Sequence, residues 1–236
     1  MTVSSLDSPL LTPPLDVRPG VDHLVTEDDT PVDNLFSEKQ QRLLTEPLYA
    51  SWPGPGQGRS FLAAANVGLF YAVEQSPFVP DVLLSLDVRC SDDLWPKSHR
   101  SYFMWEYGKP PDVVIEIVSN RRGGEDSDKL RGYAQIRIPY YAIFDPERML
   151  SDEILRACEW HRFQYRPLDD PGLLPGIGLG LRSWHGVFEN HDNTWLRWID
   201  AEGKWIATGG ERAERAEQRA DKLVEQLRRL GVEPEV

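Results

Sequence analysis

The segment PDVVIEIVS, residues 111–119, has the composition of a strand that is buried on both faces. Side chains alternate along a strand, so Glu116 shares a face with Val114 and Val118 and interrupts an otherwise apolar run. A carboxylate inside a sheet is costly unless it has a partner. The sequence therefore predicts a cation, a metal ion or a hydrogen-bond donor beside Glu116.

Three other apolar segments predict strands around this one: residues 61–74, 80–88 and 140–146 (FLAAANVGLFYAVE, PDVLLSLDV and YYAIFDP). Residues 125–139 (EDSDKLRGYAQIRIP) precede the last of them and are typical of a helix that Pro139 ends. A strand, a helix and a strand in succession favour a crossover between parallel strands. The predicted fold class is therefore α/β.

Helices are expected at both ends of the folded region. Asn34 or Ser37 is a candidate cap for a helix over residues 35–52, with three leucines toward a core, namely Leu35, Leu43 and Leu44. Residues 160–208 are typical of further short strands and turns.

The composition changes at Gly209, where a charged helical pattern begins. Its apolar residues follow a 3-4 spacing over three heptads: Ala213, Ala216, Ala220, Leu223, Leu227 and Leu230. So narrow an apolar stripe predicts a coiled-coil helix that pairs with a second copy, or alternatively with the body of the domain. We expect a flexible, acidic, Pro-rich arm over residues 1–33, a folded domain over 34–208 and the helix within 209–236.

The charge balance limits the classes of function that the chain can have. The 236 residues include 26 Lys and Arg against 38 Asp and Glu, a net charge of −12. This argues against a protein that coats nucleic acid through bulk charge. Residues 1–50 hold nine acidic and three basic side chains, 3 − 9 = −6, so half of the excess lies near the N-terminus. Net charge therefore does not exclude DNA as a substrate.

Localisation is expected to be cytoplasmic. The chain has no apolar run long enough for a membrane span, and its N-terminus lacks the pattern of a signal peptide. Its two cysteines, Cys90 and Cys158, are far apart and outside any zinc-type spacing, so we expect free thiols.

Asp81 and Lys129 are the candidate partners of Glu116. Asp81 begins a neighbouring predicted strand, and paired strands lie only ~4.8 Å apart, whereas Asp112 lies about 13 Å along the same strand as Glu116. Two carboxylates that hold Mg²⁺ and a lysine that orients water are what phosphodiester hydrolysis requires. The alternative is that Asp81 only starts a strand and that Glu116 and Lys129 form an ion pair.

An ordered set of four motifs makes the interpretation of the chain more specific. The motifs are VPD at residues 79–81, PDVVIEIVS at 111–119, K-x-x-x-Y at 129–133 and YAIFDP at 141–146. This set resembles the putative restriction endonuclease domain family of bacteria, a branch of the PD-(D/E)XK nuclease superfamily. The resemblance implies a restriction-endonuclease-like core, a mixed sheet flanked by helices, and an endodeoxyribonuclease that uses Mg²⁺ or Mn²⁺.

By that resemblance Asp81 and Glu116 bind the metal, and Lys129 is the motif lysine, moved to the helix because Val118 occupies its usual strand position. Three further residues are candidates to line the site: Asp112, Ser119 and Tyr133. Arg121 and Arg122 are candidate DNA contacts in the loop before the helix.

The chain departs from the family pattern where Glu125 replaces an aspartate four residues before the lysine. Two alternatives to a DNA endonuclease stay open. One is an inactive nuclease fold that binds DNA or protein and assembles as a dimer through residues 210–230. The other is a hydrolase of another phosphate ester.

Overall fold

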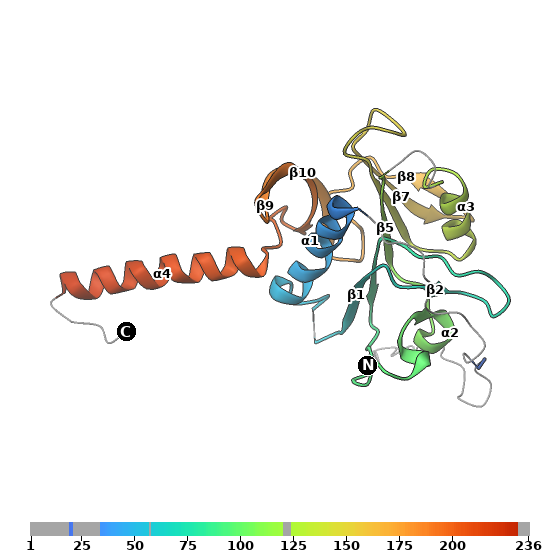
Figure 1. Cartoon of the computed structure of the whole chain (residues 1–236), viewed down its shortest axis with the longest axis horizontal. Helices are drawn as coiled ribbons and strands as arrows, with labels where there is room; N and C mark the ends of the chain where they lie inside the picture. Colours follow the sequence, from blue (N-terminus) through green and yellow to red (C-terminus); the bar gives the residue numbers. More distant parts are fainter. Residues whose placement is uncertain (1–18, 21–33, 57, 120–123, 231–236) are drawn as a thin grey trace, which may run out of the picture.

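The computed structural model describes residues 19–20, 34–56, 58–119 and 124–230 (Figure 1). The elements, in chain order, are α1 (Leu35–Ser51), β1 (Phe61–Ala65), β2 (Leu69–Phe70), β3 (Val82–Leu86), η2 (Lys97–His99), β4 (Tyr102–Phe103), α2 (Met104–Tyr107), β5 (Val113–Ile117), α3 (Asp128–Gln135), β6 (Tyr140–Phe144), β7 (Leu155–His161), β8 (Gln164–Pro167), β9 (Leu179–Phe188), β10 (His191–Asp200) and α4 (Gly209–Arg229). The predicted arm over residues 1–33 lies outside the described residues, apart from residues 19 and 20.

A six-stranded mixed sheet forms the centre of the molecule, in the order β1-β3-β5-β6-β7-β8. Strands β5 and β6 are parallel and α3 connects them, which confirms the predicted crossover. The other neighbours in this sheet pair antiparallel. The α/β class is thereby confirmed.

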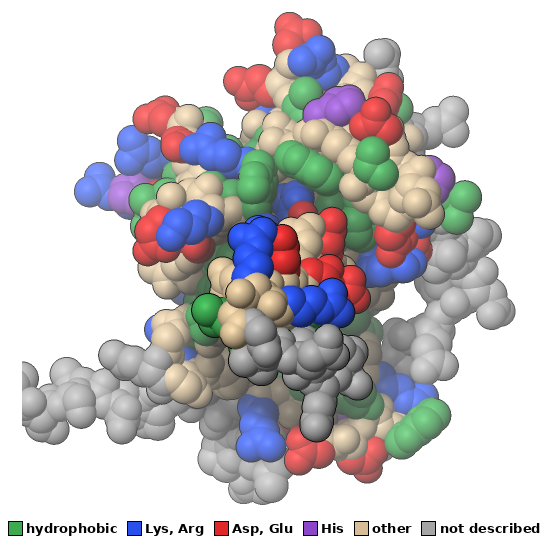
Figure 2. Space-filling model, turned by 90° about the vertical axis from the view of Figure 1, so that its left-hand side faces the viewer, with side chains coloured by type: hydrophobic (Ala, Val, Ile, Leu, Met, Phe, Trp, Pro, Cys, Tyr) green, Lys and Arg blue, Asp and Glu red, His purple; other side chains and the backbone are tan. Residues whose placement is uncertain are grey.

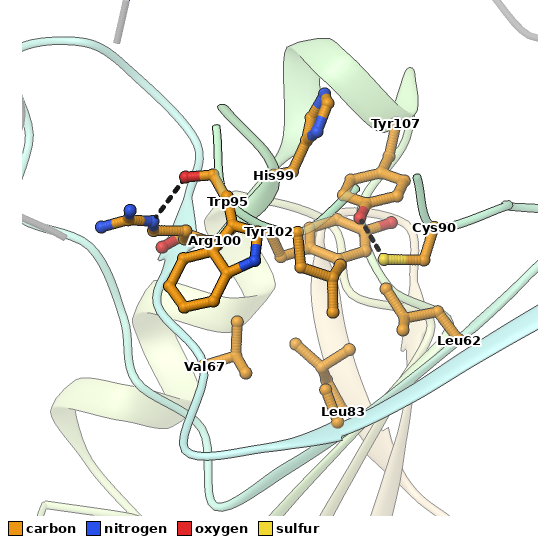
Figure 3. Close-up of a pocket in the computed structure, with 12 residues that line it drawn as sticks. Leu62, Val67, Leu83, Cys90, Trp95, His99, Arg100, Tyr102 and Tyr107 are labelled. Carbon is orange, nitrogen blue, oxygen red and sulfur yellow. Dashed lines mark hydrogen bonds between the residues drawn. The ribbon is translucent and has the colours of Figure 1, made fainter. Parts of the chain in front are cut away.

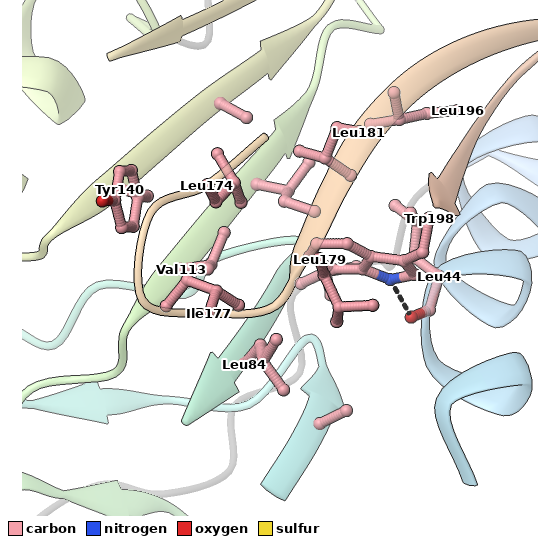
Figure 4. Packing of buried hydrophobic residues seen from close by; sticks show 14 of the residues in the cluster. Leu44, Leu84, Val113, Tyr140, Leu174, Ile177, Leu179, Leu181, Leu196 and Trp198 are labelled. Atoms are coloured by element: carbon pink, nitrogen blue, oxygen red, sulfur yellow. Dashed lines mark hydrogen bonds between the residues drawn. The ribbon is translucent and has the colours of Figure 1, made fainter. Parts of the chain in front are cut away.

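One face of the sheet packs against α1 and the β9–β10 hairpin (Figures 1 and 4). From β5 it presents Val113, Ile115 and Ile117, as the alternation predicts. Trp198 of β10 is 1 % exposed and donates its indole N–H to the Leu44 carbonyl of α1 over 2.7 Å. The hairpin and α1 therefore form one apolar layer on the sheet.

The opposite face carries a second apolar cluster, in which Val114 of β5 and Val118, just after β5, pack with Tyr133 of α3. This is the face on which Glu116 lies, because side chains two residues apart on a strand point the same way. Helix α3 therefore covers the part of β5 that holds Glu116 (Figure 1).

Helix α1 begins where Asn34 accepts a hydrogen bond from the Ser37 amide, so Asn34 is the cap. Leu43 and Leu44 are buried as predicted, but the prediction for Leu35 is wrong, because this side chain is 80 % exposed. Its position is on the opposite side of the helix from the buried stripe that contains Leu44 and Leu48.

The C-terminal half departs from the sequence analysis in one respect. Strands β9 and β10 each have ten residues, longer than the short strands expected there. Cys90 and Cys158 are free thiols, as predicted. Within the described ranges, none of the helices combines the length and the apolar character that crossing a membrane requires.

Helix α4 forms over the predicted residues and extends away from the body of the molecule (Figure 1). Thr208 caps it in a capping box with Glu211. None of its residues is buried, and Leu223 is 53 % exposed. The single chain thus leaves the apolar stripe uncovered and does not show a coiled coil.

Candidate active site

Glu116 is fully buried, and both of its carboxylate oxygens accept hydrogen bonds from α3. Lys129 donates to Oε2 over 2.8 Å, and the Tyr133 hydroxyl donates to Oε1 over 2.6 Å. Lys129 and Tyr133 are one helical turn apart, so they reach the strand from the same side of α3. The partner that the sequence predicts for Glu116 is therefore present, and it is a lysine–tyrosine pair.

Asp81 lies beside Glu116 because of the register between β3 and β5. Val82 pairs with Ile115, and continuing this antiparallel register by one residue sets Asp81 opposite Glu116. Its carboxylate accepts the Ile117 amide over 2.6 Å and the Gln41 side-chain amide over 3.1 Å. These two bonds hold Asp81 at the end of β5 where Glu116 lies.

The charges of this cluster are strongly coupled. Burial raises the pKa of Glu116 to about 8; the Lys129 ammonium opposes this rise, and the Asp81 carboxylate adds to it. Burial disfavours the Lys129 ammonium, but Glu116 outweighs that cost and raises the pKa of Lys129. Burial and the charge of Glu116 also raise the pKa of the Tyr133 hydroxyl, which therefore stays a hydrogen-bond donor.

The raised pKa of Glu116 predicts a pH-dependent stability in the absence of divalent ions. Between about pH 4.5 and pH 8 the folded state binds the Glu116 proton and the unfolded state releases it. The stabilisation is complete below pH 4.5 and is lost as the pH rises towards 8. Urea unfolding in EDTA at several pH values measures this loss as the difference from Glu116→Gln, in which the group cannot titrate. Parallel stability curves for the two proteins over this window would contradict it.

The donor atoms suit a hard divalent cation. An ionised carboxylate has about four lone-pair positions, and Lys129 and Tyr133 use one on each oxygen of Glu116. Over the described part of the chain, no group of three or more His, Cys, Asp and Glu side chains is arranged to hold a metal. Mg²⁺ commonly takes one or two carboxylates together with waters and substrate phosphates. The carboxylate oxygens of Asp81 and Glu116 therefore fit Mg²⁺ or Mn²⁺ as ligands.

Comparison with known proteins places these residues in a family. The family model described as "Uma2: Putative restriction endonuclease" matches residues 28–169, more than half of the chain. The chain belongs to this family. Among solved structures it is similar to the "crystal structure of a putative nuclease belonging to DUF820 from Anabaena variabilis ATCC 29413" at 14 % identity and a TM-score of 0.41, covering 61 % of this chain and 73 % of that one. The search of curated proteins gave no match.

The Uma2 match confirms the family resemblance that the motifs indicate. It includes Asp81, Glu116 and Lys129, and it extends over the whole six-stranded sheet. It ends before the β9–β10 hairpin and α4.

The structure does not bring all of the other predicted site residues to the cluster around Glu116. Asp112 is four residues before Glu116 on the same chain segment and accepts hydrogen bonds from Lys109 and the Leu86 amide, so the structure does not bring it into the cluster. Ser119 is half-buried just beyond the end of β5. Arg121 and Arg122 lie outside the described residues.

Sequence reasoning missed Arg156 on β7. Ile143 pairs with Glu116 on one side and with Arg156 on the other, so the three residues form one row across the sheet. The Nε and Nη2 atoms of Arg156 are buried and have no hydrogen-bond partner. A desolvated guanidinium without an acceptor favours an anion. The sequence carries little signal for it, because β7 (LRACEWH) holds several polar side chains and Arg156 does not stand out among them.

Glu125 is a second missed member of the cluster. It is 5 % exposed, and its Oε1 lies 4.0 Å from the Lys129 ammonium, while its Oε2 is buried without a hydrogen-bond partner. Its carboxylate is therefore near the same lysine that Glu116 accepts from.

Proposed function

We propose that this protein is a Mg²⁺- or Mn²⁺-dependent endodeoxyribonuclease that hydrolyses DNA phosphodiester bonds. The observation that carries the proposal is the buried Glu116 carboxylate, held by Lys129 and Tyr133 and set opposite Asp81 in the β3–β5 register. Buried acids with strongly shifted pKa values concentrate at functional sites. Membership of the Uma2 family supports the same activity class.

Each residue of the cluster has a role in this proposal. Asp81 and Glu116 hold the cation, which when bound polarises the scissile phosphate and lowers the pKa of the attacking water. Lys129 orients this water and compensates the negative charge that develops in the transition state. Tyr133 fixes the Glu116 carboxylate through its hydrogen bond. Arg156 in the same row, whose buried Nε and Nη2 have no hydrogen-bond partner among the described residues, binds a phosphate of the substrate.

DNA is the proposed substrate, bound through a limited set of basic groups and the metal rather than through bulk charge. The segment 120–137 carries five basic and three acidic side chains, although the net charge of the protein is −12. Arg121 and Arg122 within this segment are the proposed contacts to the DNA backbone. Binding is consequently expected to weaken steeply as the salt concentration rises.

The test is calorimetric titration of Mn²⁺ into the wild type and Glu116→Ala, together with nicking of supercoiled plasmid by both proteins. The wild type is expected to bind Mn²⁺ and nick the plasmid, and Glu116→Ala to lose both. If metal binding is the same in both proteins and neither nicks DNA, the enzyme proposal is wrong, and an inactive binding module becomes the better account.

The uncovered apolar face of α4 favours a second candidate property, the assembly of two copies of the chain. Charged side chains surround the helix in the view along it (Figure 2), while its leucines remain exposed. The stripe is uninterrupted over three heptads, as a homodimeric coiled coil requires. We propose that two copies pair through residues 210–230, whether the nuclease fold is active or serves as a DNA- or protein-binding module.

The Leu223→Glu/Leu227→Glu variant is expected to convert a dimer into a monomer. Both side chains lie on the exposed stripe, so the change leaves the packed body intact and places like charges in the helix interface. Light scattering measures the mass. Gln218→Glu, on the outer side of the same helix, is the matched control and should stay dimeric. An unchanged mass for the leucine variant would refute pairing through α4.

A further inference from the structure

A cavity of about 600 Å³ lies on the same face of the sheet as Glu116. Its floor includes Leu83 of β3, which pairs with Val114 of β5. Glu116 is two residues further along β5, so the floor is separated from the site by about 5 Å across the sheet and about 7 Å along it. The cavity and the cluster around Glu116 are therefore neighbours on one face of the sheet.

The cavity is shaped for a flat ring (Figure 3). The Trp95 ring stands on one side and the rings of Tyr102 and Tyr107 on the other, with Val67 and Leu83 below. The two tyrosine rings stack at a centroid distance of 4.4 Å and an angle of 15°. A volume of this size is within the range of pockets that bind small molecules, ~300–1,000 Å³. It accommodates an aromatic ring with an attached sugar.

Trp95 is an exposed aromatic residue on a fixed backbone. Trp95 is 81 % exposed, and the preceding residue, Leu94, is 57 % exposed. The Trp95 amide donates to Asp93 over 3.0 Å, and its carbonyl accepts from Arg100 Nε over 2.9 Å. A large apolar ring held in solvent at the mouth of a cavity marks a binding surface.

The charges of the residues that line the cavity indicate the chemical class of the ligand. Among the described residues, those that line the cavity include Arg100 and His99 but no aspartate or glutamate. An apolar slot with a guanidinium group at its rim is complementary to an aromatic ring that carries a phosphate. This combination is the chemistry of a nucleotide.

We propose that this cavity binds an unpaired nucleobase of the DNA strand, which stacks on Trp95 while Arg100 contacts the adjoining phosphate. This inference rests on the proposed function and deepens it, because it names DNA with an unpaired or extruded base as the preferred substrate. Base–aromatic stacking is tolerant of sequence, so the preference is for an unpaired base and not for one base type. The bound base would anchor the strand beside Asp81 and Glu116.

The test uses the full chain in EDTA, where no cleavage occurs. The probe is a duplex with one unpaired 2-aminopurine, compared with the same duplex carrying an abasic position in its place. The wild type is expected to quench the 2-aminopurine and to bind the first duplex about tenfold more tightly than the second. Trp95→Ala should lose both effects, while Phe163→Ala, at an equally exposed aromatic residue outside the cavity, should keep them.

Equal affinity of the wild type for the two duplexes would overturn the proposal, as would quenching that persists in Trp95→Ala. Deoxynucleoside monophosphate as a competitor separates the two sources of the ligand: competition at micromolar concentration would replace DNA by free nucleotide as the ligand and thus overturn the proposal. Glu116→Ala separates this test from that of the nuclease. It should quench like the wild type, so a protein that quenches but never nicks DNA retains the base site and loses only the proposed activity.

Discussion

Replacing Lys129 with methionine is expected to slow plasmid nicking by ~100–1,000-fold, the usual effect of removing one electrostatic stabiliser of a transition state. Lys129 is the only cation bonded to Glu116 within the described residues, and its ammonium lies 2.8 Å from the carboxylate. Methionine keeps the length and the apolar stem of the side chain but cannot orient a water. Gel assays of nicking at saturating Mn²⁺ measure the rate.

Arg131→Met is the matched control, since Arg131 lies on the same helix, is largely exposed and pairs only with the exposed Asp128. This variant should nick DNA within about twofold of the wild type. Mn²⁺ titration of Lys129→Met separates the role of Lys129 in the reaction from metal binding, because the carboxylates that hold the ion remain. A nicking rate that Lys129→Met leaves unchanged would assign the Glu116–Lys129 pair to structure alone.

Replacing Arg197 with alanine is expected to give the largest loss of stability, about 3 kcal/mol, because it removes hydrogen bonds between charged groups, worth about 1.5–3 kcal/mol, together with two cation–π contacts. Arg197 of β10 is 3 % exposed and donates to both carboxylate oxygens of Glu211, over 2.9 and 2.7 Å. Its guanidinium also lies between the rings of Trp184 and Trp205, with its carbon 4.9 and 5.4 Å from their centroids. The substitution removes all of these contacts and leaves Glu211, the glutamate of the α4 capping box, without its cation.

Urea unfolding measures this loss, with Arg182→Ala as the control on the same hairpin. Arg182 is about half exposed and forms a 3.2 Å surface pair with Asp170, so its removal should cost less than about 1 kcal/mol. Equal effects of the two substitutions would show that the buried contacts of Arg197 do not anchor α4.

The Glu116–Lys129 pair was predictable from the sequence because both of its parts are local. A single acid in an apolar strand demands a partner, and the next element along the chain is a short helix that must cross back over that strand. Lys129 and Tyr133, four residues apart on that helix, then face the strand together.

The position of Asp81 beside Glu116 was predictable only as a possibility. It depends on β3 and β5 being neighbours and on their register, which long-range packing determines. The row that includes Arg156 depends likewise on the order of three strands, β5, β6 and β7. The cavity beside Trp95 is formed by segments that no periodic pattern links, and sequence reasoning therefore could not find it.

Helix α4 forms as the sequence predicts, and its pairing with a second copy stays a prediction, because a heptad stripe specifies an apolar face and leaves its occupant open. The error at Leu35 is of another kind. Residues at the first turn of a helix need not follow the buried stripe, so the hydrophobic character of Leu35 was a poor guide to its burial.

The central claim is that Asp81 and Glu116 hold one divalent cation. Anomalous scattering from crystals of the protein soaked in Mn²⁺ tests it most directly. The account predicts a single strong peak within about 2.2 Å of a carboxylate oxygen of each residue, and its absence in crystals of Glu116→Gln. Mn²⁺ bound only elsewhere in the molecule, in crystals of a protein that nicks DNA, would contradict the account.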